Sequence, residues 1–149
     1  MTAAAGPVAE LPPGVVGIGV DAVDVDRFRE VLARRPGLAE RLFTGAERAD
    51  AARSPDAAAR LAARFAAKEA VMKALRSGIG SFALRDVEVV RAPGTGATSG
   101  APSLVLRRRA AELARGRQVG RWHVSLTHTR RLAVAMVVAE AGSDAPGEA

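Results

Sequence analysis

The sequence predicts a single α+β domain, and three observations lead to this prediction. Residues 60–80, RLAARFAAKEAVMKALRSGIG, have the apolar spacing of one long helix that leaves through a glycine-rich segment. Short runs rich in β-branched residues near both ends of the chain are typical of strands. Because helical and strand patterns do not alternate in a regular βαβ order, an antiparallel sheet packed with helices is favoured over a parallel one.

The composition limits the class of protein. The chain has 149 residues, 48% of them hydrophobic but only 3% aromatic, so we expect one domain with a small core of Ala, Val and Leu. Without cysteine, disulfides and zinc–thiolate sites are excluded. The lack of a long apolar run and of a secretory start predicts a cytoplasmic protein. We predict disordered ends at 1–13 and 141–149 around a domain at 14–140.

The chain is basic, with a formal net charge of +6 that comes mostly from arginine. A basic protein attracts anionic partners, and arginine favours two-point contacts with phosphate or carboxylate. Nucleic acid, a phosphorylated cofactor and an acidic protein all fit this charge.

The first predicted strand, residues 15–21, ends at Asp21. Gly17 and Gly19 inside it permit the close approach of another backbone or of a ligand. The other expected elements follow by their caps and periodicity. In the first half they are a helix over 25–35 capped by Asp24, a short helical segment at 38–43, a helix opened by a capping box of Thr44 and Glu47, and the long helix capped by Ser54-Pro55. In the second half they are a strand within 82–91, a loop at 92–102, a strand at 103–106, a helix at 107–115, and a final hairpin of strands 122–126 and 132–140.

Lys68 is the unexpected residue of the long helix. Leu61, Phe65, Met72 and Leu75 fall on one narrow stripe at about 100° per residue, and Lys68 lies in the middle of it. Lysine is almost never fully buried unless it is paired. We therefore expect its ammonium group either to reach solvent or to hold a buried charge against a partner.

Asp21 and Glu69 are candidate metal ligands. Two carboxylates brought together suit Mg²⁺, which takes oxygen ligands and keeps several waters for phosphates. Gly78 and Gly80 can present backbone N–H groups to a phosphate. In the alternative interpretation, Asp21 is a turn or cap residue and Glu69 forms a solvated i,i+4 pair with Lys73.

The final hairpin carries Ser125 and His128, which raise a second possibility. A serine near a histidine is the pairing used in nucleophilic catalysis, but no supporting acid accompanies them and their spacing is unspecific. A histidine in a turn is usually a polar surface residue.

Together these motifs resemble the holo-(acyl-carrier-protein) synthases, from about residue 15 to 140. Each motif alone is weak, but their order and spacing are specific. They are Gly17-Ile18-Gly19-Val20-Asp21 followed by Arg27-Phe28; Leu42-Phe43-Thr44 with Glu47; Arg64-Phe65-Ala66-Ala67-Lys68-Glu69-Ala70 through Lys73-Ala74-Leu75 to Gly78-Ile79-Gly80; and His123-Val124-Ser125-Leu126-Thr127-His128-Thr129 followed by Ala133, Ala135, Val137, Val138 and Glu140.

The resemblance implies a 4′-phosphopantetheinyl transferase. Such enzymes move the phosphopantetheine arm of coenzyme A to a serine of an apo carrier protein and release 3′,5′-ADP. It implies Mg²⁺ held by Asp21 and Glu69, and roles for both in catalysis together with Lys73. The group that deprotonates the carrier serine stays open among Glu69, a metal-bound water and Lys73. The implied coenzyme A contacts are Lys68, Lys73, Ser125, His128 and Thr129.

The resemblance also implies partners. Short members of the family form homotrimers with active sites between subunits, and their carrier proteins are acidic. Fatty-acid, polyketide and peptide synthases all use such carriers, and the sequence does not choose among them. The implied carrier contacts on the first helix are Arg27, Phe28, Val31, Arg34 and Arg35.

The chain departs from the family in its longer loop at 92–102, in its extended termini and at two sequence positions. Arg76 stands where a small residue is common, and Gly100-Ala101-Pro102 replaces the usual Gly-Lys-Pro. Two alternatives to the transferase stay open: a basic nucleic-acid-binding domain without catalysis, which explains the charge but offers no tyrosine for stacking, and a catalytically silent structural subunit of the same fold.

Overall fold

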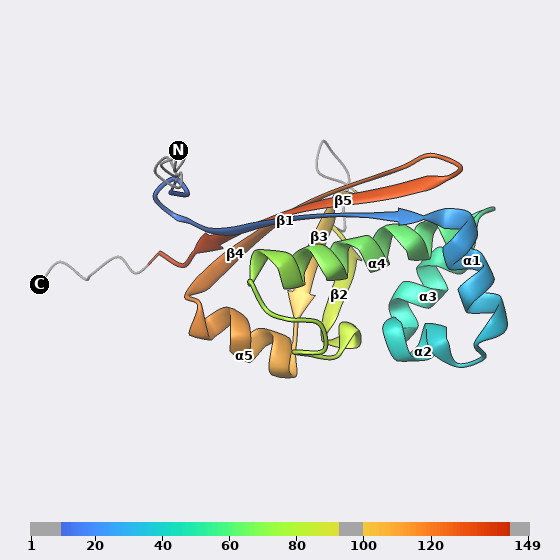
Figure 1. Cartoon of the computed structure of the whole chain (residues 1–149), viewed down its shortest axis with the longest axis horizontal. Coiled ribbons are helices and arrows are strands. Elements are labelled where there is room, and N and C mark those ends of the chain that lie inside the picture. The colour runs from blue at the N-terminus through green and yellow to red at the C-terminus, as the bar shows by residue number, and fades with distance from the viewer. Residues whose placement is uncertain (1–9, 93–99, 144–149) are drawn as a thin grey trace, which may run out of the picture.

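A computed structural model describes residues 10–92 and 100–143 of the chain (Figure 1). The predictions made for 1–9, 93–99 and 144–149 lie outside the described residues. The elements are β1 (Val15–Asp24), α1 (Val25–Arg34), α2 (Leu38–Leu42), α3 (Gly45–Ala52), α4 (Ala57–Ala74), the 3-10 turn η1 (Leu84–Asp86), β2 (Val87–Arg91), β3 (Pro102–Leu106), α5 (Arg108–Gly116), β4 (Val119–His128) and β5 (Leu132–Ala141).

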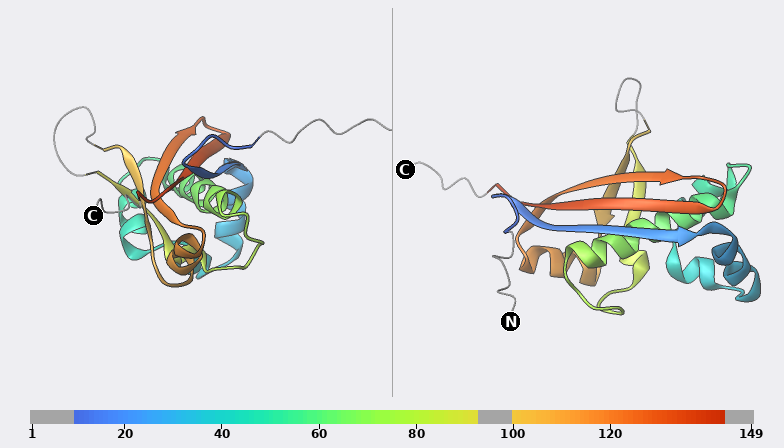
Figure 2. Two further views of the ribbon diagram at one scale, coloured as in Figure 1. Left: turned by 90° about the vertical axis from the view of Figure 1, so that its left-hand side faces the viewer. Right: turned by 45° about the horizontal axis from the view of Figure 1, so that its top comes forward.

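The long strands form an antiparallel sheet that lies across the long helix. Its order is β1-β5-β4, so the final hairpin supplies the centre and one edge and β1 supplies the other edge. Figures 1 and 2 show α4 along one face of this sheet, with α1, α2 and α3 gathered near one end of the helix. Strands β2 and β3 form a separate antiparallel pair. The predicted α+β class with an antiparallel sheet is confirmed.

Gly17 and Gly19 set the distance between β1 and α4. A Cβ atom added at Gly17 would lie 1.9 Å from the carbonyl oxygen of Ala74, and one at Gly19 would lie 1.9 Å from that of Ala70. Both contacts are far inside van der Waals range, so only glycine permits this spacing. The predicted close approach is confirmed, and the backbone that approaches is that of the long helix.

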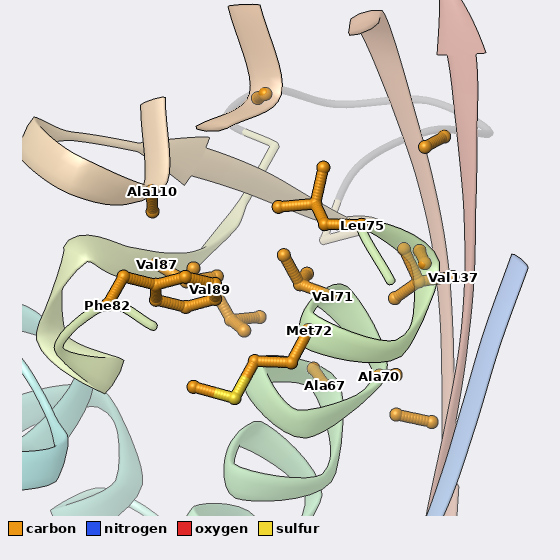
Figure 3. Close-up of a cluster of buried hydrophobic side chains, with 14 of the residues drawn as sticks. Ala67, Ala70, Val71, Met72, Leu75, Phe82, Val87, Val89, Ala110 and Val137 are labelled. Carbon is orange, nitrogen blue, oxygen red and sulfur yellow. The ribbon is translucent and has the colours of Figure 1, made fainter. Parts of the chain in front are cut away.

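The main core lies between α4, the sheet and the β2–β3 pair. Figure 3 shows Val71 of α4 and Leu75, which caps the C-terminus of α4, in the same cluster as Val87 of β2 and Val137 of β5, and all four are completely buried. Alanines fill most of the remaining helix surface, which lets the sheet pack closely. A second cluster forms where Phe28 and the other side chains of α1 and α3 meet the first half of α4. The expected core of small aliphatic residues is confirmed.

The first strand is longer than predicted, and the predicted caps of α1 and α3 are present. Strand β1 does not end at Asp21 but continues to Asp24, because its pairing with β5 extends as far as Leu132. Asp24 then caps α1 as predicted, with its side chain accepting a hydrogen bond of 2.8 Å from the backbone N–H of Arg27. The predicted capping box at the start of α3 is also present.

The predicted cap of the long helix was wrong. Asp56, not Ser54-Pro55, is the N-cap of α4, and its carboxylate accepts a hydrogen bond of 3.1 Å from the N–H of Ala59. The strand predicted within 82–91 covers only 87–91, because 84–86 form a 3-10 turn. Within the described residues no helix is long and apolar enough to cross a membrane.

Candidate active site

Asp21 and Glu69 line one pocket of about 660 Å³. Asp21 comes from β1, two residues after Gly19, and Glu69 comes from α4, next to the Ala70 carbonyl that Gly19 approaches. The glycine spacing therefore brings the two carboxylates to the same place. The rest of the lining is mostly apolar, with one arginine, and consists of Ala22, Val23, Asp24, Arg27, Phe28, Val31, Leu38, Leu42 and Phe65.

The two carboxylates share an unfavourable environment when no cation is present. Burial raises the pKa of Glu69 above its ordinary 4.5, the negative charge of Asp21 raises it further, and the charge of Lys73 opposes both. A divalent cation relieves this repulsion. The donors are hard oxygens, and among the described residues no third His, Cys, Asp or Glu joins them. Two carboxylates leave ligand positions for water and phosphate, which fits Mg²⁺.

Lys73 lies at the edge of this pair. Its ammonium donates a hydrogen bond of 2.9 Å to Asp21 Oδ1 and one of 2.8 Å to the carbonyl oxygen of Val20. The solvated i,i+4 pair of Glu69 with Lys73, which was the alternative interpretation, is not among the ion pairs of the described residues. The side chain of Lys73 is 54% exposed, so its charge also faces solvent beside the carboxylates.

Lys68 is completely buried and points away from the carboxylate pair. Its ammonium donates to Glu47 Oε2 at 2.8 Å and to the carbonyl oxygens of Leu84 and Val87, and burial lowers its pKa. The expected buried partner is thus Glu47. The expected contact of Lys68 with coenzyme A does not fit this placement, because the hydrogen bonds of the ammonium are made inside the core.

A second pocket, of about 150 Å³, contains a residue that sequence reasoning missed. It is lined by Arg64, Val89, Arg91, Pro102 and Leu126. The Arg64 side chain is only 4% exposed and forms an ion pair with the carboxylate of Asp50 on α3, yet its Nε has no hydrogen-bond partner. One signal was available in the sequence: Arg64 lies one turn before Lys68, on the same side of the helix.

The expected coenzyme A residues of the last hairpin lie on a different surface. His128 and Thr129 line a pocket of about 330 Å³ beside Asp56, at the start of α4. Ser125 lies on the outer face of β4, and within the described part of the chain it makes no hydrogen bond to His128. Gly78 follows the other end of α4, as does Gly80. A single chain therefore brings Asp21, Glu69 and Lys73 together but leaves these residues apart.

The residues expected to contact the carrier divide into two groups. Arg27, Phe28 and Val31 line the same pocket as the carboxylate pair. Arg34 and Arg35 are exposed at the end of α1, where Arg34 lies 3.8 Å from the carboxylate of Glu30 on the same helix. The first group thus links the expected docking helix directly to the candidate site.

Comparison with known proteins identifies the family. Residues 17–137 match the model of the 4′-phosphopantetheinyl transferase superfamily, which includes nearly all the described elements. The chain belongs to this superfamily. Membership in this superfamily makes the chain an enzyme and favours the transferase interpretation over a nucleic-acid-binding domain.

Relatives and structures in the superfamily agree with this assignment. The chain is 53% identical over 126 residues to a holo-[acyl-carrier-protein] synthase of Frankia alni, covering 85% of this chain and 98% of the relative. A Bacillus anthracis synthase structure in complex with CoA (3′,5′-ADP) is 30% identical, has a TM-score of 0.67, and covers 87% and 99%. A Helicobacter pylori synthase structure in complex with coenzyme A is 26% identical, has a TM-score of 0.69, and covers 83% and 99%.

Proposed function

We propose that the chain transfers the 4′-phosphopantetheine arm of coenzyme A to a serine of an apo acyl carrier protein and releases 3′,5′-ADP. The observation that supports this most directly is the pocket lined by Asp21 and Glu69, together with the hydrogen bond that Lys73 donates to Asp21. The relatives named as synthases and the structures of such synthases with coenzyme A support the reaction and its donor.

Asp21 and Glu69 are the proposed Mg²⁺ ligands. Burial and the neighbouring Asp21 raise the pKa of Glu69, although Lys73 partly opposes this, and a divalent cation with oxygen ligands would stabilise both ionised carboxylates. When bound, Mg²⁺ supplies charge neutralisation to the pyrophosphate and to the leaving group.

Residues of the chain act on the transferring phosphate and on the proton of the carrier serine. The serine oxygen of the carrier bonds to the phosphorus of the phosphopantetheine phosphate, and the bond from that phosphorus to the oxygen of 3′,5′-ADP breaks. The exposed ammonium of Lys73 stabilises negative charge on the transferring phosphate. As proton acceptor for the serine hydroxyl we favour Glu69 over Lys73, because the Lys73 ammonium donates hydrogen bonds to Val20 and Asp21.

The pocket lined by Arg64 and Arg91, called the arginine pocket below, is the proposed site for a further phosphate of coenzyme A. Arg64 brings a buried Nε without a partner, and Arg91 brings a second guanidinium to the same 150 Å³ space, where Asp50 forms an ion pair with each of them. Guanidinium groups match phosphate oxygens in charge and geometry. We propose His128, Thr129 and the backbone of Gly78 and Gly80 as further contacts with coenzyme A that another copy of the chain supplies, because one chain holds them apart.

We propose that the functional unit is a homotrimer. The outer face of the sheet exposes large apolar side chains: Ile18 is 59% exposed, Val20 56% and Met136 54%. We propose a second copy of the chain as the occupant of this face, because large apolar side chains exposed together mark an interaction surface. The carboxylate pair lies at the β1 edge and the hairpin residues at the β4 edge, so assembly would place one edge beside the other and complete a site between subunits.

We propose that the carrier docks along α1. Carrier proteins are acidic, and Arg27 is an exposed arginine that has no ion-pair partner among the described residues and lines the catalytic pocket. Phe28 and Val31 add apolar surface in the same pocket, and Arg34 and Arg35 continue the basic surface. An acidic carrier of fatty-acid, polyketide or peptide synthesis is the proposed acceptor. The cytoplasmic location expected from the sequence stays a prediction.

The transfer itself is tested with coenzyme A, Mg²⁺ and purified apo carrier proteins. A mass gain of one phosphopantetheine on a carrier, lost with EDTA, is the expected result. Intact-protein mass spectrometry measures it, and no gain on any carrier from folded protein would contradict the proposal.

A further inference from the structure

The buried pair of Glu47 and Lys68 joins three parts of the molecule. Both side chains are completely buried, and Lys68 Nζ lies 2.8 Å from Glu47 Oε2. Glu47 also closes the capping box of α3, accepting a hydrogen bond of 2.9 Å from the N–H of Thr44. Its other oxygen, Oε1, accepts one of 2.9 Å from the N–H of Val89 on β2. Helices α3 and α4 and strand β2 therefore meet at one carboxylate.

Lys68 fixes the same strand from the helix side. Its ammonium donates to the carbonyl oxygen of Leu84 at 3.1 Å and to that of Val87, which lie just before and at the start of β2. Strand β2 pairs with β3 alone and is not hydrogen-bonded into the large sheet in the described structure. The position of β2 against α4 therefore depends on side-chain packing, on the ion pairs of Asp50 of α3 with Arg91 and Arg64, and on the hydrogen bonds of this pair.

The arginine pocket is built across the junction that the pair holds. Val89 both donates to Glu47 and lines the pocket, and Arg91 follows it on β2. Arg64 stands on α4 one turn before Lys68 and lines the pocket from the opposite side. A shift of β2 relative to the helix would change the separation of the two guanidinium groups.

Stability alone is a weak reason to bury such a pair. Removing two charges from water is costly, and replacement of a buried ion pair by apolar side chains of similar volume is often neutral or stabilising. Apolar side chains at these two positions could not hydrogen-bond to the N–H of Val89 or to the carbonyl oxygens of Leu84 and Val87.

We propose that Glu47 and Lys68 are positioning residues that hold β2 against α4 and thereby set the geometry of the Arg64–Arg91 pocket. This inference rests on the proposed function, which places a phosphate of coenzyme A in that pocket. It also gives Lys68 a role in donor binding without direct contact with the donor.

The test compares a double variant with a matched destabilised control. Glu47→Leu with Lys68→Met removes both charges together, so no unpaired charge is left in the core. Leu113→Ala removes packing from α5, outside the arginine pocket, and controls for a general loss of stability. Calorimetry measures the affinity of each folded protein for 3′,5′-ADP, and steady-state transfer gives KM for coenzyme A and kcat.

We expect the double variant to bind 3′,5′-ADP about tenfold more weakly, the size of one lost hydrogen-bonded contact, with a matching rise in KM for coenzyme A. Leu113→Ala should leave both values unchanged. Adding Arg64→Met to the double variant should cost less than Arg64→Met costs in the wild type, because both changes act on the same pocket. Equal affinities in the double variant and in the Leu113→Ala control would overturn the positioning role.

A second variant keeps the test decisive if the double variant does not fold. Glu47→Gln preserves the side-chain volume, but its single carbonyl oxygen cannot replace both carboxylate oxygens toward Lys68 and Val89. We expect weaker binding of 3′,5′-ADP here as well, and unchanged binding would overturn the inference. If the wild type neither binds 3′,5′-ADP nor modifies any carrier, the proposed function fails instead, so the two failures are distinguishable.

Discussion

The Lys73 ammonium on α4 donates a hydrogen bond of 2.9 Å to the Asp21 carboxylate on β1. This contact crosses from helix to strand, although Lys73 has the spacing of a helical ion pair with Glu69. It places one positive charge beside two carboxylates at the edge of the candidate site. The charge is therefore available both to Asp21 and to a phosphate that enters the pocket.

Lys73→Met should impair transfer far more than folding. We expect a loss of about 100-fold in kcat/KM, typical when a charged group acting on the reacting centre is removed. The free energy of unfolding should change by less than about 1 kcal/mol, because the ion pair is largely exposed. Denaturant unfolding and steady-state transfer measure the two effects. Wild-type turnover by this variant would remove Lys73 from the reaction.

The raised pKa of Glu69 predicts a pH dependence of stability in the metal-free protein. Between its ordinary pKa of 4.5 and its raised pKa in the fold, Glu69 binds more protons in the folded state than in the unfolded state. Folded wild-type protein therefore loses stability as pH rises through this window. Glu69→Gln does not titrate there, so its stability relative to wild type should increase with pH above 4.5 and then level off. Urea unfolding across this range measures the difference.

Glu140→Gln provides a control of opposite sign. A hydrogen bond with His123 lowers the pKa of Glu140, so the carboxylate stabilises the fold above the ordinary pKa of 4.5, and this stabilisation is lost as pH falls through the lowered value. The variant should therefore be less stable than wild type near neutral pH and approach it in acid. The same slope for both variants would show that at least one of the two carboxylates lacks the environment described.

Gly19→Ala should separate the helix from the strand. The new Cβ would lie 1.9 Å from the Ala70 carbonyl oxygen, and because that atom belongs to the backbone, α4 as a whole must move. We expect a destabilisation of about 1–3 kcal/mol or more, as for other overpacked sites. Transfer should also fall, because Glu69 moves with the helix. Gly116→Ala is the control: nothing lies within 4 Å of its Cβ position, and it should not destabilise the protein.

Arg27→Glu should weaken carrier binding without unfolding α1. The new carboxylate lies in the first turn of the helix, where negative charge is favourable. We expect KM for an acidic apo carrier to rise about tenfold or more at low salt, with a smaller effect at high salt. KM for coenzyme A should stay the same. Arg115→Glu on α5 makes the same change of charge elsewhere, and an equal rise in this control would show a general charge effect instead of docking on α1.

Met136→Glu should dissociate the proposed trimer. Met136 is 54% exposed at the centre of the outer sheet face, where it pairs with Val20 of β1 and Ser125 of β4. Wild-type protein should sediment at three times the chain mass of 15.4 kDa, and the variant at the mass of one chain with little activity. Ser103→Glu, exposed on β3, should remain trimeric. A monomeric and fully active wild type would contradict assembly at this face.

Features with local causes could be predicted from the sequence. The cap at Asp24 and the box at Thr44 depend on residues within one helical turn, and both are present. Lys68 was marked by its place on an apolar stripe, so either a path to solvent or a buried partner was expected. Its identity was not predictable, because Glu47 lies 21 residues away and reaches Lys68 only through the packing of α3 on α4.

The arginine pocket could be recognised only from the tertiary structure. Arg64 and Arg91 belong to different elements, and nothing in their spacing shows that they face one space. The error at Ser54-Pro55 had a local cause, since Asp56 offers an equally good capping side chain two residues later. The apolar outer face of the sheet was also missed, because the sequence of a strand does not show which of its side chains lie on the face away from α4.

The most direct test of the central claim is transfer by Glu69→Ala beside wild type. Each protein is incubated with coenzyme A, Mg²⁺ and a panel of apo carrier proteins, and the carriers are weighed intact. The account predicts one added phosphopantetheine with wild type, none after EDTA, and none with a folded Glu69→Ala protein. Modification by Glu69→Ala at the wild-type rate, or by wild type in EDTA, would contradict a reaction centred on Asp21 and Glu69.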